Sequence, residues 1–117
     1  MPYMLDGNLL EVETEPVLKD GTLWVPFRKL GEALGGTVDW EPSTGVAILY
    51  IANRVATLQI GDKTADVDGE QTELQAAPYA ENGESWVPVR FFEKALGYTL
   101  SADPENGILD LTTPAVV

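Results

Sequence analysis

Apolar and polar residues alternate along the chain in short runs that predict β-strands. The apolar run VAILYI at 46–51 is followed, after the segment ANR, by VATLQIG at 55–61. Runs of this length, rich in β-branched residues, are typical of strands. Two shorter runs, TLWV at 22–25 and ESWV at 84–87, also predict strands.

A different spacing of apolar residues predicts two short helices, at 26–34 and 88–96. Their apolar positions lie at i, i+3 and i+7, as expected for one face of a helix. These positions are Phe27, Leu30 and Leu34 in the first helix and Val89, Phe92 and Leu96 in the second. Gly35 and Gly97 follow as C-cap residues. Helices this short are marginal alone, so we expect each one to pack against a sheet.

Three dipeptides predict tight hairpin turns between strands. They are Asp20-Gly21, Asp68-Gly69 and Asn82-Gly83. Both central residues of a two-residue type I′ turn need positive φ, which Asp, Asn and Gly tolerate best. The strands that flank each dipeptide should therefore be antiparallel neighbours.

The chain repeats itself at a shift of 62 positions. Between residues 3–50 and 65–112, 16 of 48 positions are identical without a gap. Many identities are glycines and prolines, which punctuate backbone shape. The sequence therefore predicts an α+β fold of two tandem pseudo-repeats, each an antiparallel β-sheet wrapped around one short α-helix.

The repeated words WVPFR and WVPVR predict a strand that turns directly into a helix. The repeat anchors are Trp24, Pro26, Arg28 and Gly35 in the first copy and Trp86, Pro88, Arg90 and Gly97 in the second. Each proline should end a strand and open a helix, and each tryptophan should pack in the core. An arginine in the first helical turn is opposed by the helix dipole. We therefore expect both arginines to have a fixed acceptor, either a neighbouring carboxylate or carbonyl or a shared ligand anion.

The whole chain, 1–117, is predicted to be a single compact domain of two units, 1–54 and 55–117. No Gly/Ser or Pro run separates the units. The strand at 55–61 precedes the second unit, and its counterpart would lie upstream of Met1. A sheet that lacks a strand exposes an edge, which we expect another chain or the C-terminal PAVV to cover.

Composition narrows the possible functions. The net charge is −12, with 19 acidic and 7 basic residues, which argues against nucleic acid as a partner and against anionic membranes. No apolar run reaches the roughly 20 residues that span a bilayer. The chain contains no cysteine and no histidine, so Ser-His-Asp and Cys-His sets are excluded. The start, MPYMLDGN, does not resemble a signal peptide, so we expect either a cytoplasmic protein or a leader that has been removed.

The words DGTLWVPFRKLGEALGGTVDW and NGESWVPVRFFEKALGYTL resemble the copper amine oxidase N-terminal-like family, also called the stalk domain. The resemblance covers about residues 3–112. Trp40 matches the tryptophan usual in the hairpin after the helix, whereas Ala102 departs from it in the second copy. The resemblance implies a five-stranded antiparallel sheet around a helix. In amine oxidases this module lies remote from the active site, and relatives occur on secreted or cell-surface bacterial proteins. It therefore implies a protein that acts outside the cell or at its surface.

We expect no cofactor. Copper prefers imidazole ligands, which this chain lacks. Calcium accepts carboxylate and carbonyl oxygens, so the acidic turns could form at most a weak calcium site.

The sequence favours a non-catalytic binding or scaffold module whose partner is a protein or a cell-wall polymer. Trp40 is the candidate ligand face, since it is the tryptophan best placed to be exposed. A first alternative is a homo-oligomerisation module, such as a homodimer formed through an exposed strand edge. A second is a small carboxylate-dependent hydrolase, using Asp39 with Glu41 or Asp103 with Glu105.

Overall fold

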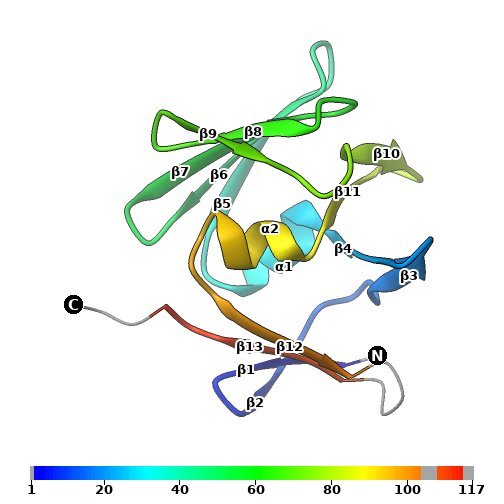
Figure 1. The fold of residues 1–117 in the computed structure, drawn as a ribbon, viewed down its shortest axis with the longest axis vertical. Coiled ribbons are helices and arrows are strands. Elements are labelled where there is room, and N and C mark those ends of the chain that lie inside the picture. Colours follow the sequence, from blue (N-terminus) through cyan, green and yellow to red (C-terminus); the bar gives the residue numbers. More distant parts are fainter. Residues whose placement is uncertain (1, 104–107, 115–117) are drawn as a thin grey trace.

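The computed structural model describes residues 2–103 and 108–114. Two short helices lie at the centre of the molecule and three β-sheets surround them (Figure 1). The helices are α1 (Phe27–Ala33) and α2 (Arg90–Lys94). The mostly β, α+β character predicted from the sequence is thus confirmed.

Within residues 2–103 and 108–114, the three sheets contain thirteen strands. The first sheet, in the order β12-β13-β1-β2, consists of β12 (Thr99–Asp103), β13 (Ile108–Thr112), β1 (Tyr3–Leu5) and β2 (Asn8–Leu10). The second, β10-β11-β4-β3, consists of β10 (Tyr79–Glu81), β11 (Glu84–Pro88), β4 (Thr22–Pro26) and β3 (Val17–Lys19). The third runs β5 (Thr37–Glu41), β6 (Val46–Ile51), β7 (Arg54–Gln59), β8 (Thr64–Val67) and β9 (Glu70–Glu73).

Every sheet takes strands from both halves of the chain, so the expected arrangement, in which each half keeps its own sheet, is wrong. The second sheet pairs β4 with β11, and the third pairs β7 with β8 within the second half while β5 and β6 come from the first. Hairpin signals specify which consecutive strands pair. They do not specify which hairpins then share a sheet, because that depends on contacts between distant residues.

The strand edge that the sequence led us to expect is also closed within the chain. β1 pairs with β2 on one side and, in parallel, with β13 on the other. In the third sheet β7 lies between β6 and β8. Shifted by 62 residues, the equivalent strands of the first sheet are β13 and β1, and these contact each other directly. The edge is therefore covered by Ile108–Thr112, and the backbone N–H of Thr113 donates to Asp6 Oδ1 at 2.8 Å. Neither another chain nor the PAVV segment is needed, and residues 115–117 lie outside the described residues.

The hairpin turns follow the sequence prediction. Asp20 and Gly21 have φ of 52° and 78°, and Asp68 and Gly69 have φ of 53° and 88°. Asn82 and Gly83 adopt 52° and 78°. Positive φ at both positions is the type I′ geometry, whose twist matches that of the flanking strands. These dipeptides therefore join β3 to β4, β8 to β9 and β10 to β11.

Both helices are shorter than predicted at their N-terminal ends. Pro26 and Pro88 end strands β4 and β11, as expected, but neither is the first helical residue. Pro26 is the N-cap of α1, while Val89 separates Pro88 from α2. Strand pairing competes for these residues, because Pro26 lies opposite Trp86 and Pro88 opposite Trp24. At the other end, Gly35 and Gly97 adopt positive φ of 100° and 81°, as a C-cap glycine should.

A single cluster of buried apolar residues drawn from both halves fills the space between the sheets. Phe27 of α1 and Phe92 of α2 are fully buried in it. Phe91 and Phe92 meet edge to face, with ring centroids 5.4 Å apart, and Phe27 meets Phe91 at 5.8 Å. Each short helix is thus held by aromatic packing rather than by its own propensity.

Candidate functional site

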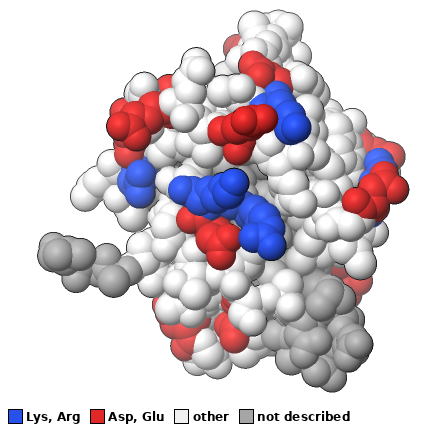
Figure 2. Space-filling model, in the orientation of Figure 1, with Lys and Arg blue, Asp and Glu red and all other residues white. Residues whose placement is uncertain are grey.

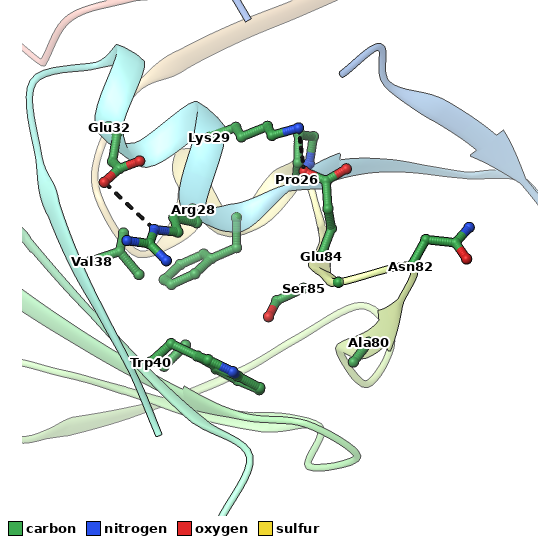
Figure 3. A pocket seen from close by; sticks show the side chains of 13 residues that line it. Pro26, Arg28, Lys29, Glu32, Val38, Trp40, Ala80, Asn82, Glu84 and Ser85 are labelled. Atoms are coloured by element: carbon green, nitrogen blue, oxygen red, sulfur yellow. Dashed lines mark ion pairs between the residues drawn. The ribbon is translucent and has the colours of Figure 1, made fainter. Parts of the chain in front are cut away.

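A cleft lies between α1, strands β5 and β6, and the β10–β11 hairpin. Its volume is about 530 Å³. Figure 3 shows Trp40 on one side of this cleft and Ala80, Asn82 and Ser85 of the hairpin on the other. The cleft therefore joins an element of the first half to a hairpin of the second. We call it the Trp40 cleft.

Trp40 lies in β5, which is an edge strand of the third sheet. Its neighbour across the sheet is Ala47, whose small side chain also lines the cleft. Because side chains alternate along a strand, Trp40 shares a face with the buried Val38. Trp40 is 37% exposed, so it is the exposed tryptophan that the sequence analysis expected.

The two cations beside the Trp40 cleft are each paired with a carboxylate. Arg28 Nε lies 3.6 Å from Glu32 Oε2 one turn along α1. Lys29 Nζ lies 3.1 Å from Glu84 Oε1 on β11. The hydrogen bond to Glu84 is the main reason that the pKa of Lys29 is raised. The cleft therefore carries positive and negative groups that cancel one another.

Lys29 also belongs to a network that holds the wall of the cleft. Its ammonium donates to Thr14 Oγ1 at 2.8 Å, and that hydroxyl donates to Glu84 Oε2 at 3.0 Å. The hydroxyl of Tyr3 donates to the Thr14 carbonyl oxygen at 2.9 Å. Burial, assisted by the nearby negative charge of Glu84, raises the pKa of Tyr3. The loop before β3 is thereby fixed to α1 and β11 together.

A second, smaller cleft of about 310 Å³ is lined by many of the corresponding positions of the repeat. Shifted by 62, the lining residues Ala80, Ser85, Val38 and Trp40 of the first cleft become Leu18, Leu23, Leu100 and Ala102 of the second. The arginine is retained as Arg90, which pairs with Glu93 at 3.4 Å. We call this the Ala102 cleft. It keeps the position of the first cleft but has aliphatic side chains in place of the indole of Trp40 and the hydroxyl of Ser85, while Gln75, Arg90 and Glu93 keep part of its lining polar.

Arg28 and Arg90 both have the fixed acceptors that the sequence analysis expected. The acceptors are Glu32 and Glu93, in the same helix as each arginine. Both arginine side chains are largely exposed, so these pairs contribute little to stability.

The other two tryptophans lie in the interior of the second sheet. Trp24 and Trp86 are buried on the neighbouring strands β4 and β11. Tyr79 contacts both, with ring centroids 4.8 Å from Trp24 and 6.4 Å from Trp86. The repeated tryptophan therefore packs against the sheet and offers no face to a ligand.

The carboxylate pair proposed for hydrolysis has no environment that would make one member an acid catalyst. Asp39 and Glu41 are both exposed on β5, on the face opposite Trp40. Hydrogen bonds from Ser43 lower the pKa of Glu41, whereas an acid catalyst needs a raised pKa. Of the second pair, Glu105 lies outside the described residues and Asp103 ends β12.

Basic side chains gather at the centre of one face, over the position of α2, with acidic side chains around them (Figure 2). Helix α2 contributes Arg90 and Lys94, which line a third hollow of about 420 Å³ beside β9. Within residues 2–103 and 108–114, no group of three or more acidic side chains is placed to hold a metal ion. The weak calcium site and the absence of copper stay predictions. No helix in the described part of the chain is long and apolar enough to cross a bilayer.

These features define a small α+β module built around a half-exposed tryptophan cleft. The chain belongs to the copper amine oxidase N-terminal domain family, whose model matches residues 4–111. The resemblance stated from the repeated words is thereby confirmed. In amine oxidases this domain is a non-catalytic module. None of the curated proteins matches the chain.

Sequence reasoning identified Trp40 but missed the hairpin that faces it. Asn82 and Gly83 were recognised only as a turn, and Glu84 and Ser85 only as part of a strand. The pairing of β4 with β11 brings this hairpin beside α1. A usable signal was present, since WVP occurs twice and two copies of one strand can pair with each other.

Proposed function

We propose that the chain is a non-catalytic binding or scaffold module of the stalk-domain type that acts at a bacterial cell surface. Its ligand face is the Trp40 cleft, and its ligand is the cell-wall polymer. A protein partner is the other candidate in this class. Resemblance to the family supports localisation outside the cell, and a cytoplasmic protein is the alternative. We expect no cofactor.

The observation that supports this proposal most strongly is the exposure of Trp40 within a cleft of about 530 Å³. Concave sites with apolar and aromatic lining and a few polar groups are the usual form of ligand pockets, and tryptophan is enriched among residues that dominate binding energy. Catalysis is disfavoured because the cleft holds paired charges and, in a chain without histidine, no evident general base.

We further propose that the two halves are tandem pseudo-repeats within one domain. The strands β4, β5 and β6 begin at 22, 37 and 46, and β11, β12 and β13 begin at 84, 99 and 108, each 62 residues later. This regularity supports duplication, although the sheets mix the two copies.

Self-association through strand edges is an alternative that one observation favours. Leu9 on β2 and Leu18 on β3 are largely exposed, and both strands lie at sheet edges. Exposed apolar edge strands pair readily with other chains. A stable dimer in light scattering would support this alternative, and a monomer would exclude it.

The binding proposal is tested by co-sedimentation with insoluble peptidoglycan. We expect the wild-type protein to sediment with the polymer, and Trp40→Ala to bind about 30-fold more weakly, which is typical of losing a dominant aromatic contact. Tyr50→Ala is the matched control, because Tyr50 is an aromatic residue of similar exposure, 42%, that does not line the cleft. Wild-type protein that stays in the supernatant, or equal binding by Trp40→Ala, would refute the proposal.

A further inference from the structure

The geometry points to an uncharged saccharide chain as the ligand of the Trp40 cleft, with one such site per chain. This inference rests on the proposed function and adds the chemical class of the ligand. Three properties of the cleft support this inference. They are a flat apolar platform, surrounding groups that donate and accept hydrogen bonds, and positive and negative charges that cancel.

The platform is the indole of Trp40 with the apolar surface beside it. Phe27 of α1 also lines the cleft, and Val38 and Ala47 line it from the sheet face that carries Trp40. Ala80 lies across from the indole (Figure 3). Because an aromatic face buries a large apolar area with few rotatable bonds, it suits a rigid ring with C–H groups on one side. A pyranose ring has that shape.

The polar groups around the platform can both donate and accept hydrogen bonds. Ser85 and Asn82 lie on the hairpin that faces Trp40 (Figure 3). Arg28 donates only, Glu32 accepts only, and the hydroxyl and amide of the hairpin do both. Sugar hydroxyls also donate and accept, so this mixture matches them. A purely apolar ligand would make no hydrogen bond with the hydroxyl and amide of the hairpin.

The charges of the cleft disfavour an ionic ligand. Arg28 is neutralised by Glu32, and Lys29 by Glu84, which is only 19% exposed. An anion would meet both carboxylates in a protein whose net charge is −12, and a cation would have to displace an arginine or lysine from its partner. A neutral ligand avoids both costs.

The Ala102 cleft explains why we infer a single site. Ala102 removes the aromatic platform, and Leu23 replaces the hydroxyl of Ser85 with an aliphatic side chain. Leu18 takes the place of Ala80. The second cleft thus lacks the aromatic platform and the serine hydroxyl, although Gln75, Arg90 and Glu93 keep part of its lining polar.

Calorimetric titration with defined hexasaccharides tests this inference. The uncharged probe is chitohexaose, the cationic probe is its fully deacetylated form, and the anionic probe is hexagalacturonate. We expect chitohexaose to bind at one site per chain and at least about tenfold more tightly than either charged probe. Ser85→Leu, which introduces the residue type of the Ala102 cleft, should weaken chitohexaose binding about tenfold. Leu23→Ser is the matched control and should bind as the wild type does.

The outcomes separate this inference from the proposed function. Tighter binding of a charged probe, two sites per chain, or unchanged binding by Ser85→Leu would overturn the inference. If no hexasaccharide binds but wild-type protein still sediments with peptidoglycan in a Trp40-dependent way, the saccharide assignment is wrong and the binding proposal stands. If sedimentation fails as well, both fall.

Discussion

Replacing Phe92 by alanine is expected to lower the free energy of unfolding by about 3–5 kcal/mol, the usual cost of a large cavity in a well-packed core. Phe92 is fully buried, and its ring lies 5.4 Å from that of Phe91 and 6.4 Å from that of Phe27. The surrounding sheets come from both halves, so the cavity cannot collapse by moving one helix alone. Urea unfolding followed by tryptophan fluorescence measures the change.

Leu9→Ala is the control for this experiment. Leu9 is 63% exposed on an edge strand, so its truncation should change the free energy of unfolding by no more than about 0.5 kcal/mol. If Phe92→Ala is as stable as Leu9→Ala, α2 is not seated in the core and the architecture described above is incorrect.

A second large effect is expected from Tyr3, because β1 closes the first sheet. Tyr3 is buried between β13 and β2, lying opposite Leu109 and Leu10. Tyr3→Ala should lower the free energy of unfolding by about 3–5 kcal/mol through the loss of a buried aromatic ring. Tyr3→Phe keeps the ring and loses only the hydrogen bond to Thr14, so we expect a loss of about 1 kcal/mol.

The comparison of the two Tyr3 variants tests the pairing of β1 with β13. Thermal and urea unfolding of both variants would be measured at the same pH, below the range in which tyrosine ionises. Equal stability of Tyr3→Ala and Tyr3→Phe would mean that the N-terminal strand does not pack on the core, which contradicts the closed sheet.

Local features of the fold could be predicted from the sequence because they depend on neighbouring residues. The turn at Asp68-Gly69 requires only residues that tolerate positive φ. The end of α1 requires positive φ at Gly35, which glycine adopts easily because it has no Cβ. The apolar spacing of Phe27 and Leu30 likewise placed both side chains on the buried face of their helix.

The arrangement of the sheets could not be predicted in this way. The parallel pairing of Tyr3 with Leu109 joins residues that are more than a hundred positions apart. The alternation of apolar and polar residues in β1 does not show whether it pairs with β13, with the C-terminal PAVV or with another chain. Any of these partners would let β1 keep its apolar face against the core. The pairing follows from the closure of three sheets around two helices, which is a property of the whole chain.

The candidate site was only partly predictable, because one part of it is local in the sequence and the other depends on long-range strand pairing. Trp40 stood out because it was the tryptophan best placed to be exposed. Its counterpart in the second copy is Ala102, and the structure places the two residues in clefts of different chemistry. The partners of Trp40 on the β10–β11 hairpin could not be named, since they reach the cleft only through the pairing of Val25 with Val87.

The central claim is that ligand binds at the Trp40 cleft and not at its counterpart. The most direct test is a titration of ¹⁵N-labelled protein with soluble muropeptides, the disaccharide-peptide fragments of peptidoglycan, followed by NMR. We predict the largest chemical-shift changes at the indole N–H of Trp40 and at the backbone amides of Asn82 and Ser85. Changes centred on Leu23 and Ala102, or a spectrum that muropeptides leave unaltered, would contradict the claim.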